Sequence, residues 1–145
     1  MSAGKRIIIA ENDENDRFLM QWAFKRAGLN NLIIFARDGE EAIELLQKKS
    51  AGDAEIDARL LLLDIRMPRL DGFGVLKWLQ DNRRFRPAHV VIFSSSCDPW
   101  DIERAKELGA DDYKVKPHGL ENCMELVREF EMRAFEGDDS AKAVE

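Results

Sequence analysis

The sequence contains few of the features that mark secreted, membrane-spanning or nucleic-acid-binding proteins. Its two cysteines, Cys97 and Cys123, do not have the spacing of metal ligands, so we expect reduced thiols in a cytoplasmic protein. No apolar run is long enough to span a bilayer, and the short one at residues 5–10 indicates a strand rather than a signal peptide. Basic residues are in the minority: the net charge of −6 argues against nucleic acid or an anionic membrane as the main partner.

What the sequence does contain is typical of one globular domain. Of its 145 residues, 45% are hydrophobic and 34% are charged, a balance that permits a real core and argues against wholesale disorder. We expect a domain over residues 1–135. It is followed by an acidic tail, residues 136–145, which has little to bury and is predicted to be disordered.

Strand-like and helix-like patterns alternate five times along the chain. Short apolar runs predict strands, and apolar residues that recur every three or four positions predict the helices between them. Such alternation is typical of a parallel sheet covered by helices on both faces, and five units favour a flavodoxin-like, doubly wound (βα)5 α/β fold with strand order 2-1-3-4-5. The predicted strands are residues 5–10, 32–36, 59–64, 88–94 and 111–115, and the predicted helices are one that ends at Gly28, 38–49, 72–82, 98–109 and 120–135.

Capping residues support several of these helix boundaries. Asp38 stands three residues before Glu41, which resembles a capping box. Asp98 precedes Pro99 at the first helical position, and Gly109 follows the last turn, which together form a complete start-and-stop signature.

Four polar residues are predicted to meet at one edge of the sheet. Glu11 follows the first strand, Asp64 ends the third, Ser94 ends the fourth and Lys116 follows the fifth. Ligands of open α/β sheets bind outside the carboxyl ends of the strands, so these side chains are expected to converge. Each alone has an ordinary explanation, such as a helix cap, a solvated turn, a loop hydroxyl or a surface lysine, but their shared position favours a functional site.

The chemistry of these four side chains favours phosphoryl transfer with a divalent metal. Two carboxylates brought together repel unless a cation lies between them, and an oxygen-rich, sulfur-free site suits Mg²⁺. A hydroxyl and an ammonium group suit phosphoryl oxygens. A carboxylate can itself accept a phosphoryl group, so Asp64 is the candidate nucleophile.

Three segments, taken with their mutual spacing, resemble the receiver domain of two-component response regulators. They are "LLLLDIRMPRLDG" (60–72), "VVIFSSS" (90–96) and "GADDYKVKP" (109–117), and the resemblance covers residues 5–135. It implies that Asp64 is the phosphoacceptor. The phosphoryl group would come from a histidine kinase or a histidine phosphotransfer protein.

The resemblance also implies how the phosphoryl group is bound and sensed. Ser94 would move to bond it, Lys116 would pair with its oxygens, and the Lys116–Pro117 peptide bond would be cis. Tyr113 matches the aromatic switch residue whose rotamer follows Ser94. Two further positions, where the family tunes the lifetime of the phosphorylated state, are Arg66 and Ser96.

One position in the implied Mg²⁺ site departs from the family pattern. Glu11, Asp64 and the backbone carbonyl of Arg66 keep their places as metal ligands. The family usually has a second acidic ligand after the first strand, and here that position is Asn12, which keeps an oxygen but loses the charge. Asp13 could supply the missing charge or cap the first helix, and its place just before the helix favours the cap.

The implied output is protein–protein contact. No DNA-binding or catalytic domain follows the receiver pattern, so we expect a stand-alone receiver that contacts a downstream protein. The polar connection 48–58 and the segment "SSSCDPWDIERAKELGA" (94–110) are similar to single-domain regulators that serve phytochrome-type kinases. A homodimer through the face of the fourth helix, fifth strand and last helix is a further expectation.

Two other functions are alternatives. A pseudo-receiver, which binds partners without taking phosphate, is favoured by Asn12. A phosphohydrolase of the haloacid-dehalogenase kind also uses an Asp nucleophile with a hydroxyl and a Lys at strand ends. It usually has a second Asp two positions after the nucleophile, where this chain has Arg66, and a cap domain, for which no segment is evident. We therefore do not expect an enzyme.

Overall fold

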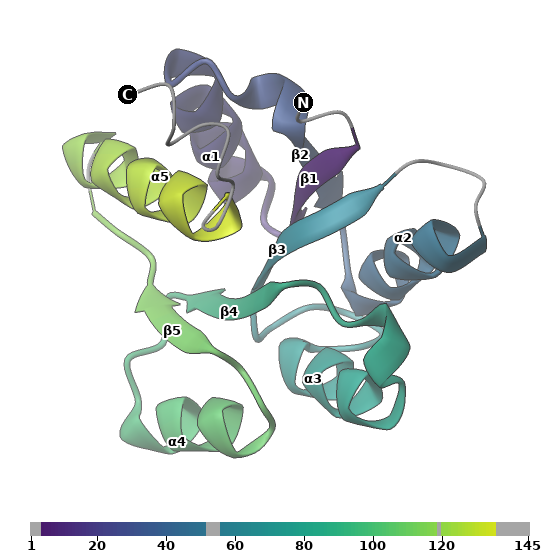
Figure 1. The fold of residues 1–145 in the computed structure, drawn as a ribbon. Helices are drawn as coiled ribbons and strands as arrows, with labels where there is room; N and C mark the ends of the chain where they lie inside the picture. Colours follow the sequence, from purple (N-terminus) through teal and green to yellow (C-terminus); the bar gives the residue numbers. More distant parts are fainter. Residues whose placement is uncertain (1–3, 52–55, 119, 136–145) are drawn as a thin grey trace.

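Five parallel strands and five main helices build the domain, in a computed structural model that describes residues 4–51, 56–118 and 120–135 (Figure 1). The sheet order is β2-β1-β3-β4-β5, so the predicted flavodoxin-like α/β fold is confirmed. The predicted tail, 136–145, and part of the 48–58 connection lie outside the described residues.

The strands are β1 (Lys5–Ala10), β2 (Ile33–Ala36), β3 (Asp57–Leu63), β4 (His89–Ser94) and β5 (Asp112–Val115). The helices are α1 (Glu14–Arg26), α2 (Gly39–Ala51), α3 (Gly72–Asp81), α4 (Pro99–Glu107) and α5 (Leu120–Ala134), with short 3₁₀ turns at Asn30–Leu32 and Arg83–Phe85.

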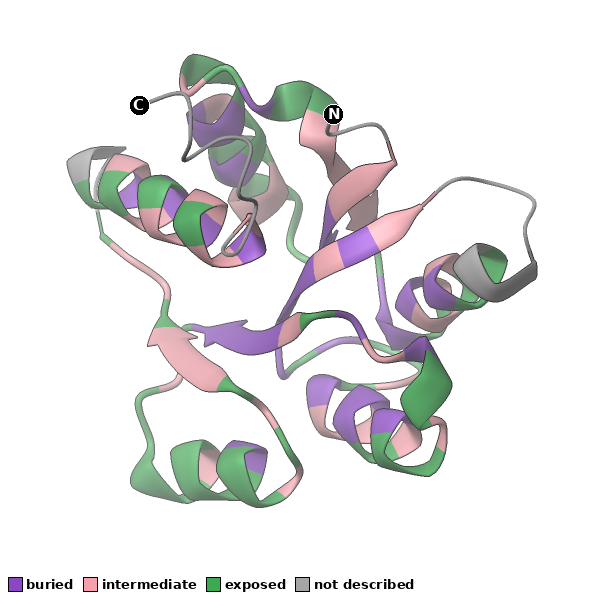
Figure 2. Cartoon of the chain, viewed as in Figure 1, coloured by how far each residue is buried: buried purple, intermediate pink, exposed green. Residues whose placement is uncertain are grey.

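The sheet is buried on both faces because each of its central strands contains an uninterrupted apolar run. Neighbouring residues of a strand point to opposite faces, so Leu60 and Leu62 pack with α1 and α5, whereas Leu61 and Leu63 pack with α2 and α3. All four of these leucines are fully buried. Figure 2 shows the buried residues concentrated along the sheet and the inner sides of the helices. Among the residues described, no helix combines the length and apolar character needed to cross a membrane.

The predicted capping residues fix where the helices begin and end. Asp98 accepts a hydrogen bond from the Trp100 amide and Pro99 opens α4, while Gly28 and Gly109 have φ angles of +78° and +97° beyond the ends of α1 and α4. Asp38 accepts from the Glu41 amide at 2.9 Å, as predicted. The Glu41 carboxylate, however, accepts from the Arg37 amide, one residue earlier than a capping box requires.

The expected cis bond between Lys116 and Pro117 is wrong: the described residues contain no cis peptide bond. The trans form is the favoured form of an X–Pro bond by about 0.5–1 kcal/mol. In the trans form the Lys116 amide still donates to the Ser94 carbonyl at 2.8 Å. The Lys116 side chain also still reaches Asp64, so these contacts do not require the cis isomer.

Gly72 allows α3 to begin directly against the end of β3. A Cβ atom on Gly72 would lie 2.4 Å from the Asp64 carbonyl oxygen, and the Gly72 amide donates to the Ile65 carbonyl at 2.9 Å.

We expect Gly72→Ala to lower the free energy of unfolding by about 2 kcal/mol or more, because backbone atoms must move to relieve the clash. Gly74→Ala is the matched control, since its Cβ would meet the movable tip of the Leu70 side chain. Urea titrations compare the two variants, and an equal cost for both would contradict the prediction.

Candidate functional site

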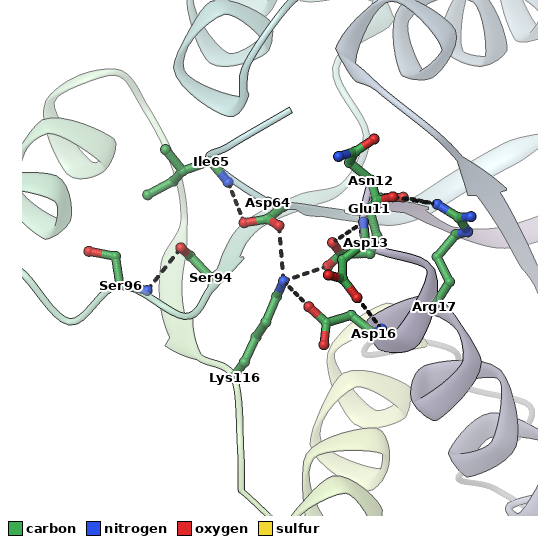
Figure 3. A network of polar contacts seen from close by, with 10 residues as sticks. All are labelled: Glu11, Asn12, Asp13, Asp16, Arg17, Asp64, Ile65, Ser94, Ser96 and Lys116. Carbon is green, nitrogen blue, oxygen red and sulfur yellow. Dashed lines mark hydrogen bonds and ion pairs between the residues drawn. The ribbon is translucent and has the colours of Figure 1, made fainter. Parts of the chain in front are cut away.

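The four polar residues predicted at the strand ends meet at one edge of the sheet (Figure 3). Glu11 follows β1, Asp64 follows β3, Ser94 is the last residue of β4, and Lys116 follows β5. Their arrangement follows from the topology, because parallel strands present all their carboxyl ends at the same edge. Glu11, Asp64 and Ser94 are buried, which is unusual for polar side chains and requires each to have a partner.

The ammonium group of Lys116 is the centre of the cluster. Its Nζ atom lies 2.7 Å from Glu11 Oε1, 2.9 Å from Asp64 Oδ2 and 2.7 Å from Asp16 Oδ2. An ammonium group has three N–H donors, so each donor has one carboxylate acceptor. The side chains of Glu11, Asp64 and Lys116 are 2%, 10% and 12% exposed, so these charge-assisted hydrogen bonds are shielded from water.

Burial and like charge make it costly for the carboxylates of this site to be ionised together. Burial raises the pKa of Glu11 to about 7; the hydrogen bond from Lys116 works in the opposite direction, and the charge of Asp64 adds to the rise. Burial also acts to lower the pKa of Lys116, but its hydrogen bonds to Asp16, Glu11 and Asp64 outweigh this, and the pKa is raised. Three carboxylates surround one ammonium, so acidic groups outnumber basic ones in the cluster, and a further cation would reduce the repulsion between them.

The donor chemistry of the site fits Mg²⁺. Among the described residues, no three His, Cys, Asp or Glu side chains are arranged to hold a metal ion by themselves. Mg²⁺ does not need such a cage, since it commonly uses one or two carboxylates and keeps several waters. Glu11 and Asp64 are the two buried carboxylates here, and Arg66 follows in an exposed loop position. In the structure, both carboxylates are bonded to Lys116, so a metal would share them with that ammonium or displace it.

Asn12 and Asp13 lie beside the cluster without contacting Lys116. The Asn12 side chain is exposed and points away from Lys116 in Figure 3. The backbone carbonyl of Asn12 accepts from Arg17 Nη1 at 2.9 Å. Asp13 caps α1: its Oδ1 accepts from the Asp16 amide at 2.9 Å, which confirms the cap that its position predicted.

Asp16 is the site residue that the sequence pattern did not identify. It lies in the first turn of α1, three residues after the cap. Acidic residues are common in a first turn because they complement the helix dipole, so Asp16 could not be distinguished from Glu14 by its sequence position. The direction of α1 places the Asp16 carboxylate against Lys116, a residue 100 positions away.

Ser94 and Tyr113 are connected through Ser96 in the loop before α4. Ser94 Oγ accepts from the Ser96 amide at 3.1 Å, and the Tyr113 hydroxyl donates to the Ser96 carbonyl at 2.7 Å. Ser96 Oγ in turn donates to Asp101 Oδ2 at 2.6 Å, which ties the loop to the first turn of α4. Ser96 thus joins Ser94 both to Tyr113 and to α4.

The loop after Asp64 is fastened to α2 by an ion pair that the sequence did not predict. Arg69 has a φ of +68°, a backbone conformation that is uncommon outside glycine. Its guanidinium donates to Asp38 Oδ2 through Nε at 2.9 Å and Nη2 at 2.5 Å. The hydrogen bond from the Glu41 amide and this guanidinium hold the pKa of the buried Asp38 below its usual value. The pair fixes the segment that carries Arg66.

Comparison with known proteins agrees with this geometry. The family model of the response regulator receiver domain matches residues 7–128. The probable methanogenesis regulatory protein FilR2 of Methanothrix harundinacea is 31% identical over 123 residues, which cover 85% of this chain and 79% of FilR2. Some curated relatives are longer: this chain covers 42% of one that is 34% identical, so the functions of such whole proteins do not carry over.

Solved structures of response regulators share this fold over about nine-tenths of the chain. The phosphorylated cyanobacterial phytochrome response regulator RcpA superposes with a TM-score of 0.77 at 27% identity, over 92% of this chain and 94% of RcpA. The Mn²⁺-bound form of response regulator Rcp1 superposes with a TM-score of 0.72 at 27% identity, over 91% and 96% of the two chains. The chain belongs to the receiver domain family of two-component response regulators, a family of signalling domains.

The raised pKa of Glu11 predicts that stability depends on pH. Between the ordinary value of 4.5 and about 7, the folded protein holds a proton on Glu11 that the unfolded chain has released. The free energy of unfolding should therefore fall as pH rises from about 5 to about 8, with on the order of 1–3 kcal/mol due to this residue. Urea titrations in EDTA would show a smaller fall for Glu11→Gln than for wild type. The exposed Glu14→Gln control should keep the full fall, and an unchanged fall in Glu11→Gln would contradict the prediction.

Proposed function

We propose that this receiver domain accepts a phosphoryl group on Asp64 from a histidine kinase or a histidine phosphotransfer protein, and signals through contact with a downstream protein. The observation that carries the proposal is the placement of Asp64 Oδ2 at the carboxyl end of the sheet, 2.9 Å from Lys116 Nζ and beside Glu11. A structural helix cap would not need a buried lysine and a second buried carboxylate around it.

The two oxygens of the Asp64 carboxylate have different partners. Oδ1 accepts the Ile65 amide at 2.8 Å, whereas Oδ2 faces Lys116. In the proposed transfer, Oδ2 forms the new bond to phosphorus while the bond from phosphorus to the donor's imidazole nitrogen breaks, and the imidazole keeps the electron pair. The Lys116 ammonium then donates to a phosphoryl oxygen in place of Oδ2, which offsets the added charge.

We assign the Mg²⁺ site to Glu11, Asp64 and the backbone carbonyl of Arg66, with the amide oxygen of Asn12 joining them once its exposed side chain turns toward the site. Bound Mg²⁺ would supply the positive charge that lets a phosphoryl group approach two carboxylates. The three carboxylates that share one ammonium support this assignment, because a further cation would offset their mutual repulsion. The Mn²⁺-bound form of Rcp1 supports it as well, since that relative has been solved with a divalent cation.

The output proposed for the phosphorylated state begins at Ser94. When Ser94 Oγ turns to the phosphoryl group, it leaves the Ser96 amide, and the bond from the Tyr113 hydroxyl to the Ser96 carbonyl is free to break. Tyr113 then changes the face formed by α4, β5 and α5, where we place the contact with a downstream protein or a second copy of the chain. Ser96 and the exposed Arg66 border the same site and are placed to influence how long the phosphoryl group survives.

The likeness to RcpA supports one class of donor for the phosphoryl group. RcpA is a phytochrome response regulator, and it matches this chain over most of its length. We therefore propose a phytochrome-type histidine kinase as the upstream partner.

A phosphate-independent pseudo-receiver is the second candidate function, favoured by the uncharged Asn12 in the metal site.

Phosphorylation of Asp64 is the direct test of the proposed function. Wild-type protein incubated with acetyl phosphate and Mg²⁺ should gain the mass of one phosphoryl group that is acid-stable and base-labile, measured by intact mass spectrometry. Asp64→Asn and EDTA-treated protein should gain none. Asp71→Asn is the matched control, because Asp71 caps α3 in the same loop and should leave the gain unchanged. A mass gain that survives Asp64→Asn would exclude Asp64 as the acceptor.

An acidic residue at position 12 would restore the charge that Asn12 lacks, and we expect it to raise the affinity for Mg²⁺. Two opposite unit charges about 4 Å apart attract by roughly 4 kcal/mol at an effective dielectric near 20, and desolvation cancels most of this. We expect Asn12→Asp to tighten Mg²⁺ by about 1 kcal/mol, roughly fivefold, in calorimetric titrations. Asp13→Asn keeps the α1 cap and should leave the affinity nearly unchanged. If Asp13→Asn abolishes binding and Asn12→Asp changes nothing, Asp13 is the metal ligand. If no variant binds Mg²⁺, the pseudo-receiver is the better proposal.

A further inference from the structure

We propose that Asp16 is a positioning residue for Lys116: it keeps hold of the ammonium group when a divalent metal takes Glu11 and Asp64, and so sets how readily the metal binds. The inference rests on the proposed function, because it assumes that the metal uses these two carboxylates. It adds a residue from α1 to a site otherwise built from strand ends.

Asp16 differs from the other two partners of Lys116 in its surroundings. Its side chain is 35% exposed, against 2% for Glu11 and 10% for Asp64. Its backbone is fixed by the hydrogen bond from its amide to Asp13 Oδ1. Asp16 therefore reaches Lys116 from the helix side of the site, and in Figure 3 it approaches the ammonium from a different side than Asp64. Among the residues described, Lys116 is the one cation within ion-pair distance of Asp16.

The number of donors on Lys116 gives Asp16 its role. The three N–H groups of the ammonium are matched by three carboxylates in the structure. A metal held by Glu11 and Asp64 would compete with Lys116 for these carboxylates and would repel the ammonium. With Asp16 present, Lys116 can give up two partners and keep the third. Without Asp16, the ammonium would have to leave Glu11 and Asp64 with no counter-charge to receive it, or remain there and compete with the metal.

Both consequences of removing Asp16 act in the same direction. The lost charge weakens the attraction for a cation, and the released Lys116 bonds more strongly to Glu11 and Asp64. We expect Asp16→Asn to weaken Mg²⁺ binding about tenfold, a change within the range measured for partly buried charge pairs. Glu14→Gln removes an exposed charge from the same turn of α1, away from Lys116, and should weaken binding less than about twofold.

The decisive measurement is a double-mutant cycle on Mg²⁺ affinity with the full chain. The Mg²⁺ dissociation constant is measured by calorimetry for wild type, Asp16→Asn, Lys116→Met and the double variant that combines them, and for Asp16→Glu and Glu14→Gln. If Asp16 acts through Lys116, its substitution costs about tenfold in the presence of the lysine and less than about threefold in the Lys116→Met background. Asp16→Glu should recover most of the affinity, because it restores a carboxylate of longer reach.

Other outcomes overturn the inference or the proposed function separately. An equal loss in both backgrounds would show that Asp16 acts on the metal without Lys116, and a loss no larger than that of Glu14→Gln would show that Asp16 has no special role; either result overturns the inference alone. The second comparison uses proteins that keep Lys116, so it holds even if Lys116→Met does not fold. Wild-type protein that binds no Mg²⁺ and gains no phosphoryl mass would overturn both the inference and the proposed function.

Discussion

The contacts of the Lys116 ammonium group are the interaction on which the rest of the site depends. They join the ends of β1, β3 and β5 to the first turn of α1, and they place a cation between two buried carboxylates that would otherwise repel one another. The same carboxylates are the ones that the proposed metal and phosphoryl group would use. Lys116 therefore partly balances the charge of these carboxylates, and the proposed ligands would have to share its contacts or replace them.

The fold supplies this arrangement through the direction of its strands and the anchoring of its loops. A parallel sheet brings all strand ends to one edge, and strands buried on both faces hold the following residues in place. The Asp38–Arg69 pair and the close approach of Gly72 to Asp64 fix the loop that follows the proposed phosphoacceptor. The loop before α4 is held by hydrogen bonds that Ser96 donates to Ser94 and Asp101 and accepts from Tyr113.

The sequence predicted the fold and most of the candidate site because those features depend on local patterns. Apolar runs define the strands, caps define the helix ends, and the strand ends define where Glu11, Asp64, Ser94 and Lys116 must meet. Asp16 could not be predicted, because an acidic residue in a first helical turn also serves the helix dipole, and its partner is 100 residues away. The pairing of Arg69 with Asp38 could not be predicted either, because the two residues lie 31 positions apart in the sequence. The cis bond expected at Pro117 came from resemblance to a family, and the structure has the trans isomer.

The most direct test of this account is the nuclear magnetic resonance signal of the Lys116 ammonium group during a Mg²⁺ titration. Burial and three carboxylate partners should slow its exchange with water, so metal-free protein labelled with ¹⁵N should show an ammonium resonance that is absent from Lys116→Met. The account predicts that this resonance shifts as Mg²⁺ is added, with the midpoint that calorimetry gives for metal binding. A Lys116 resonance that stays unchanged while the protein becomes saturated with Mg²⁺ would contradict it, because the lysine and the metal would then not share Glu11 and Asp64.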